Sequence, residues 1–161
     1  MYNKHEKIFS VVLIVLLIIL TCFCIYKEQK YTKIEKHLES YIIMDIDRLY
    51  DSVDDLKKTA STSHSRELCA EILLGLREFN MFESKIDTSN IEYLIMGYQR
   101  IMSDIDTRGI DGSSQKLELF ELYMGKFQEC DGDSLIGKII NFNNEIFNDE
   151  EFGKLIRMQG D

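Results

Sequence analysis

The chain has 161 residues, with 28 acidic side chains against 19 basic ones and a formal net charge of −9. This excess of carboxylates argues against a nucleic-acid partner, because phosphate contacts need clustered lysine and arginine. Proline is absent and the first glycine is Gly75. The two strongest helix breakers are therefore missing from a long N-terminal stretch, which permits long uninterrupted helix.

An unbroken apolar run occupies residues 8–26, after a short tail formed by residues 1–7. As a helix this run reaches about 28 Å, close to the roughly 30 Å hydrocarbon core of a bilayer. It lacks the small residues of a signal-peptidase site, and neither Cys22 nor Cys24 follows the small residue expected before a lipid-modified cysteine. The sequence therefore predicts an uncleaved signal anchor, and a single-pass protein of the cell membrane whose first partner is the lipid bilayer.

Lysines flank the apolar run on both sides and decide which side of the membrane each end is expected to occupy. The flanking lysines are Lys4 and Lys7 before the run and Lys27, Lys30, Lys33 and Lys36 after it. Counted strictly with the terminal amine, they place the C-terminal side in the cytoplasm by one charge. Long domains translocate largely regardless of charge, however, and a short tail before a large domain is a common export arrangement. We expect an extracytoplasmic C-terminal domain.

Charge is polarised along the chain. Residues 1–36 contain six basic and three acidic side chains, whereas the remainder from His37 contains 13 basic and 25 acidic ones. The basic end suits anionic lipid headgroups. The acidic remainder would attract a basic protein or a cationic ligand by electrostatic steering; the alternative is that its charge only keeps the domain soluble.

Residues 27–161 are expected to form one acidic domain made of helices. Apolar residues at a mean spacing of 3.57 predict a first helix over residues 27–59. These residues are Tyr31, Ile34, Leu38, Ile42, Ile46, Leu49, Val53 and Leu56. No breaker separates them from the apolar run, so anchor and first helix could be continuous.

The same periodicity predicts further helices after a polar turn at residues 59–65. The second helix is expected at about residues 66–83, with Ser65 as its cap, and the third is expected to begin at Ser89. The fourth is expected at about residues 114–128. The fifth is expected to end at Ile146 with Ile139 and Ile140 facing inward, and a short last helix is expected after Asn148–Asp149. Gly109 and Gly112 are expected to open a loop in which Ser113 is exposed. No segment alternates with a period of two. The predicted fold is all-α, an N-terminal single transmembrane helix followed by an antiparallel α-helical bundle.

Two motifs resemble known ligand sites but depart from them. Residues 132–139 fit a phosphate-binding loop until Ile139, which stands where a hydroxyl should hold magnesium. Residues 104–115 begin like a calcium loop, yet Arg108 and Gln115 replace ligand positions. The three histidines match no metal-binding or catalytic pattern. We therefore predict no catalytic residue, cofactor or metal site, and expect no enzymatic activity.

Cys69 and Cys130 lie outside the apolar run. In an exported domain they could form one disulfide, but two reduced thiols in the core are the favoured interpretation.

One surface feature is a candidate docking site. The four residues that we name the aspartate stripe are Asp47, Asp51, Asp54 and Asp55. Their spacing places them on one helix face, away from the apolar residues, where like charges repel. They form either a solvated face balanced by Arg48, Lys57 and Lys58 or a docking surface for a basic partner.

These features favour a non-enzymatic protein-interaction or scaffold module anchored in the membrane. Two alternatives stay open. A sensor or ligand-binding domain would use the continuous helix to transmit a shift, although a tail of seven residues offers nothing to receive it. A membrane-tethered immunity protein would use the acidic surface to neutralise a basic toxin.

Overall fold

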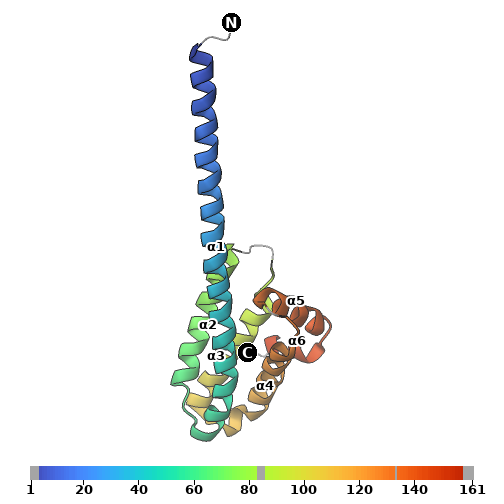
Figure 1. Ribbon diagram of the computed structural model, residues 1–161. Helices are drawn as coiled ribbons and strands as arrows, with labels where there is room; N and C mark the ends of the chain where they lie inside the picture. Colours follow the sequence, from blue (N-terminus) through green and yellow to red (C-terminus); the bar gives the residue numbers. More distant parts are fainter. Residues whose placement is uncertain (1–3, 83–85, 133, 158–161) are drawn as a thin grey trace. The chain divides into compact units, whose positions relative to one another are not determined.

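The computed structural model describes residues 4–82, 86–132 and 134–157, and every regular element in these ranges is a helix (Figure 1). The elements are α1 (Lys4–Thr59), α2 (Ser63–Phe82), α3 (Ser89–Arg108), the 3-10 helix η1 (Asp111–Ser113), α4 (Ser114–Glu129), α5 (Leu135–Ile146) and α6 (Glu150–Arg157). The chain divides into two compact units, Met1–His37 and Leu38–Asp161, and α1 contributes residues to both. The all-α prediction, an apolar N-terminal helix followed by a helical bundle, is confirmed.

The first unit contains the apolar helix. Every residue from Phe9 to Tyr26 is exposed, and this part of α1 is long and apolar enough to cross a membrane, with a mean hydropathy of 3.0 over 18 residues. The hydroxyl of Thr21 donates a hydrogen bond of 2.8 Å to the Leu17 carbonyl, so that this polar group has its partner within the helix. At the end of the run, the Lys27 ammonium lies 5.5 Å from the centre of the Phe23 ring.

The second unit has its own hydrophobic core, to which α1 to α6 all contribute side chains. In α1 the buried residues are Ile42, Ile46, Leu49, Val53 and Leu56, which follow the predicted helical spacing. Successive helices from α1 to α4 alternate in direction within this unit (Figure 1). Only a few residues connect each helix to the next, and such short connections favour antiparallel neighbours.

Aromatic side chains fill the part of the core between α3, α4, α5 and α6. The rings of Tyr98 and Phe120 stack with centroids 3.9 Å apart, while Phe152 makes edge-on contacts with Tyr123 and Phe142. Such ring pairs stabilise a core by more than the area they bury. They attach the short helix α6, which is otherwise too short to be stable by itself.

Glycine allows α1 and α2 to approach closely. A Cβ atom built on Gly75 would lie 2.9 Å from the Ile42 Cγ1 atom, which is closer than real side chains come. The first glycine of the chain therefore occupies the point where a larger residue would push α2 away from α1.

Several predicted boundaries are confirmed and some inward positions are wrong. α1 ends at Thr59 as expected, α4 keeps its predicted limits to within one residue, α5 ends at Ile146, and α6 begins at Glu150, directly after the predicted cap. Ile140 is predicted to face inward, but 47% of its surface is exposed. Tyr31 and Ile34 of the predicted apolar spacing are exposed as well, by 50 and 42%. The buried residues of α5 lie at Leu135, Ile139, Phe142 and Ile146, a narrow stripe that leaves Ile140 outside.

Two expectations about polar residues are also corrected. Ser65 does not cap α2, because the helix already begins at Ser63, and the Ser65 hydroxyl instead lies 2.9 Å from that of Ser52 in the core. Ser113 is not in an open loop: it belongs to η1 and only 1% of its surface is exposed.

Candidate functional site

The aspartate stripe lies on the solvent side of α1. Asp47, Asp51, Asp54 and Asp55 are all exposed, whereas Ile46, Leu49 and Val53 of the same turns are buried. The structure therefore brings the four predicted site residues together on one face. None of the four forms a salt bridge with a described residue, although the Gln128 side-chain amide donates a 3.1 Å hydrogen bond to Asp47.

Two of the three basic residues expected to balance the stripe have other partners, and the third, Lys58, is exposed. Arg48 pairs with Asp45 at 3.3 Å, and Lys57 pairs with Glu121 of α4 at 2.5 Å. The hydrogen bond to Glu121 raises the pKa of Lys57, assisted by the charges of Glu121 and Asp54, while desolvation opposes the rise. Both cations are thus committed to neighbouring carboxylates, and the stripe keeps its negative charge exposed.

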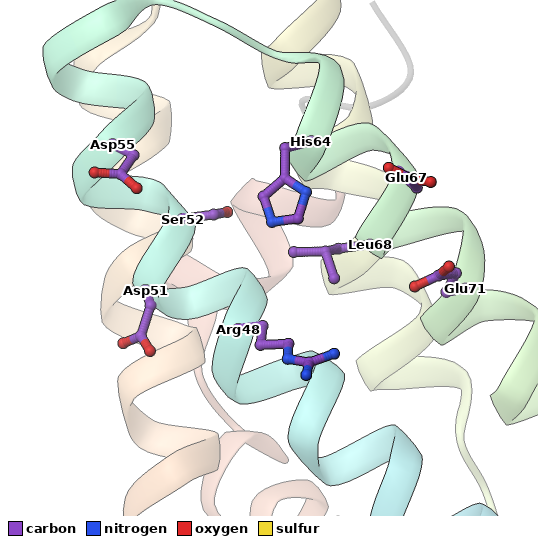
Figure 2. Close-up of a pocket in the computed structure, with 8 residues that line it drawn as sticks. All are labelled: Arg48, Asp51, Ser52, Asp55, His64, Glu67, Leu68 and Glu71. Carbon is purple, nitrogen blue, oxygen red and sulfur yellow. The ribbon is translucent and has the colours of Figure 1, made fainter.

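A hollow of about 440 Å³ lies beside the stripe, between α1 and α2 (Figure 2). Its lining residues are Arg48, Asp51, Ser52, Asp55, His64, Glu67, Leu68 and Glu71. Figure 2 shows Ser52, His64 and Leu68 between the two helices, with Glu67 and Glu71 along α2. Asp51 and Asp55 lie on the other side of α1 in this view and point away from α2. Carboxylates therefore stand on both sides of the hollow.

A second hollow of about 390 Å³ adjoins the first and shares Arg48 and Glu71 with it. Its other lining residues are Leu38, Tyr41, Ile42, Met44, Asp45, Leu74, Gly75 and Glu78. We name the two hollows together the α1–α2 furrow. One end of the furrow is thus acidic and the other is largely apolar.

Acidic side chains also lie on the side of α1 that is next to α4. A hollow of about 370 Å³ there is lined by Tyr50 of α1 and by Glu118, Glu121, Leu122, Gly125, Lys126 and Glu129 of α4. The stripe therefore lies between two sets of glutamates, one on α2 and one on α4. Sequence periodicity placed the aspartates on one face of α1, but it could not show which helices would flank that face.

The motifs that resemble ligand sites serve the fold. Asp104 and Asp106 lie within α3 rather than in a loop, and they pair with Lys116 at 2.9 Å and Arg66 at 2.6 Å. A hydrogen bond from Lys116 lowers the pKa of Asp104, and hydrogen bonds from Thr62 and Arg66 lower that of Asp106. Across the described ranges, no three histidine, cysteine or acidic side chains are grouped so that they could hold a metal ion.

The segment that resembles a phosphate loop ends α4 and begins α5. Ser134 accepts a hydrogen bond from the Gly137 amide and caps α5, and the Lys138 ammonium donates to the carbonyls of Gln128 and Cys130 at 2.8 and 3.1 Å. A cation at the C-terminal end of α4 satisfies carbonyls that the helix leaves free. Residue 133 of this motif lies outside the described residues.

Comparison with protein-family models, curated proteins and solved structures gives no match.

Cys69 and Cys130 of the bundle are free thiols, in agreement with the prediction of two reduced thiols. Cys69 is fully buried in α2, and burial raises the pKa of its thiol to about 12, well above the range in which thiolates react. Burial also raises the pKa of Cys130, as does the nearby carboxylate of Glu145.

Proposed function

We propose that this protein is a single-pass membrane protein whose acidic helical bundle docks a basic partner protein beside the bilayer. It acts by binding and not by catalysis. The apolar part of α1 is the signal anchor, and the bundle is extracytoplasmic. Long exposed apolar helix is unfavourable in water, and lipid is the solvent that matches it.

The observation that carries the docking role is the exposed, unpaired charge of the aspartate stripe. Four carboxylates at this spacing repel one another and cost a few tenths of a kcal/mol per pair. Two of the neighbouring cations are bound to other carboxylates, Arg48 to Asp45 and Lys57 to Glu121. The third, Lys58, is exposed, and its single charge does not offset four carboxylates. A partner with lysine or arginine would relieve it, and complementary charge would also accelerate the encounter.

The proposal can be tested in intact membranes with a photocrosslinking amino acid in place of His64, which is exposed beside the stripe. We expect a defined crosslinked partner that is rich in lysine and arginine. Changing the four stripe residues to asparagine should reduce the crosslinked product at least about tenfold, because an interface that loses its central charges loses affinity on this scale.

A matched control removes the same amount of charge from other elements. It combines Asp111→Asn, Asp131→Asn, Glu145→Gln and Glu151→Gln, all of which are exposed. The crosslinked product should persist in this control. The proposal is contradicted if the product survives in the stripe variant, or if the captured protein is itself acidic.

A further inference from the structure

Large apolar side chains are exposed together at one end of the α1–α2 furrow. Tyr41 and Met44 of α1 and Leu74 of α2 line the same hollow, with 60, 38 and 59% of their surfaces exposed. A single exposed apolar side chain is ordinary, but three large ones around one hollow are typical of a surface that another molecule covers. Methionine adapts easily to different partners, and tyrosine and leucine supply contact area.

The floor of the furrow at this end is apolar. Ile42 is buried, and a side chain on Gly75 would clash with it, so the two helices are close together at this point. Because Gly75 has no side chain, the surface between Tyr41 and Leu74 is hollowed and not filled. From Tyr41 to Asp55 the α1 side of the furrow spans about 21 Å, which corresponds to about four turns of a partner helix.

Charge determines which occupant fits. The carboxylates that line the furrow belong to Asp45, Asp51, Asp55, Glu67, Glu71 and Glu78, and Arg48 is the one arginine or lysine among its described lining residues. A second copy of this acidic chain would bring like charges together, and an anionic lipid surface would be repelled for the same reason. A cationic partner meets carboxylates on both helices.

From these observations we infer that the α1–α2 furrow binds an amphipathic helix with lysine or arginine on its polar face. Its apolar residues would pack on Tyr41, Met44 and Leu74. Its cations would face Glu67 and Glu71 of α2, with Asp51 and Asp55 at the outer α1 edge of the furrow. Recognition of a helix in a groove by apolar anchors at helical spacing is a recurring binding mode. This inference rests on the proposed docking function and specifies the form of the partner and the site that it occupies.

The test uses the full chain in nanodiscs of neutral phosphatidylcholine and a synthetic peptide as the probe. The peptide has 18 residues of leucine and lysine, ordered so that the leucines share one helix face, and carries one photoreactive leucine analogue. A second peptide has the same composition in an order that produces no apolar face. Mapping of the crosslinks onto the chain separates binding to the furrow from peptide that is only dissolved in the lipid.

We expect the amphipathic peptide to crosslink to α1 and α2 in the furrow, around Tyr41 to Arg48 and Glu71 to Glu78. Leu74→Asp should reduce these crosslinks about tenfold, because it places a charge where an apolar anchor packs. Leu122→Asp is the matched control, since Leu122 of α4 is similarly exposed, at 52%, and lies outside the furrow. Its crosslinks should equal those of the unmodified chain.

Two results would overturn the inference. One is crosslinking of both peptides to the same extent, which means that charge alone attracts them; the docking role of the aspartate stripe would then survive without the furrow. The other is crosslinking that leaves the furrow residues unlabelled or that is unchanged by Leu74→Asp. Failure of the docking function itself is recognised separately: the partner crosslinked through position 64 would then be captured equally well by the stripe variant and by the unmodified chain.

Discussion

The hydroxyl of Tyr123 in α4 donates a 2.8 Å hydrogen bond to the carboxylate of Asp149, the residue that caps α6. The same carboxylate accepts hydrogen bonds from the amides of Glu151 and Phe152 and from the Lys126 ammonium. Burial alone would raise the pKa of Asp149, but these hydrogen bonds outweigh it and lower the pKa to about 2. One side chain thus both begins α6 and attaches it to α4.

Asp149→Asn should destabilise the bundle by about 1–2 kcal/mol at neutral pH, because it removes a charged cap and a partly buried acceptor. Denaturation by urea, followed by circular dichroism on the full chain in detergent, measures the change. Glu151→Gln is the control on the same helix. The Glu151 side chain is 65% exposed, and its replacement should alter stability by less than about 0.5 kcal/mol.

The pH dependence of this difference has a defined sign. The folded pKa of Asp149, about 2, lies below the ordinary value of about 3.9 for an unfolded aspartate. The contribution of Asp149 is therefore complete above about pH 5 and is lost as the pH falls toward 2. The difference between the original chain and Asp149→Asn should shrink across that window. A difference that stays constant from pH 6 to pH 2 would refute the assigned charge interaction.

Tyr98 and Phe120 should respond very differently to substitution, although their rings stack. Burial raises the pKa of Tyr98 to about 12, and its hydroxyl has no hydrogen-bond partner of good geometry among the described residues. Tyr98→Phe should therefore be neutral or stabilising by up to about 1 kcal/mol. Phe120→Ala should cost about 3–5 kcal/mol, since it leaves a cavity. Strong destabilisation by Tyr98→Phe would mean that the hydroxyl has a partner.

Two glycines inside helices provide a matched pair. A Cβ atom on Gly125 would lie 3.7 Å from the Tyr50 hydroxyl, an ordinary contact, whereas one on Gly75 would clash with Ile42 at 2.9 Å. Gly125→Ala should stabilise α4 by about 0.5–1 kcal/mol through helix propensity. Gly75→Ala should lose that gain and destabilise, because α2 would have to move away from α1. Equal stabilisation of both variants, measured by thermal denaturation, would show that the close approach is absent.

Membrane orientation can be measured with a thiol reagent that does not cross membranes. Gln115→Cys is exposed in the first turn of α4 and should be labelled in intact cells if the bundle is extracytoplasmic. Ser113→Cys, two residues earlier, should resist labelling because that position is buried. Labelling of Gln115→Cys only after lysis would place the bundle in the cytoplasm.

Helical periodicity predicted most of the fold because the buried residues of each helix repeat at its pitch. The apolar positions of α3 and α4 and the capping role of Asp149 could be identified from the sequence alone. The burial of Ser113, the pairing of Ser65 with Ser52 and the exposure of Ile140 could not, since each depends on how a helix contacts its neighbours. The same applies to the site. The aspartate stripe follows from spacing on α1, but the apolar end of the furrow exists only where Tyr41 and Leu74 meet across two helices.

Both proposals depend on the attachment of the chain to a lipid bilayer through residues 8–26. Extraction of isolated membranes with alkaline carbonate tests it most directly, on the full chain and on a variant with Leu16→Lys and Ile18→Lys. Each lysine at the centre of a span costs about 2.5–3.5 kcal/mol, so this variant should be released. A control with Tyr31→Lys and Ile34→Lys, which lie outside the run, should stay bound. We predict that the unmodified chain remains in the membrane pellet at its full length. Its release into the supernatant, or its recovery without the first two dozen residues, would contradict the account.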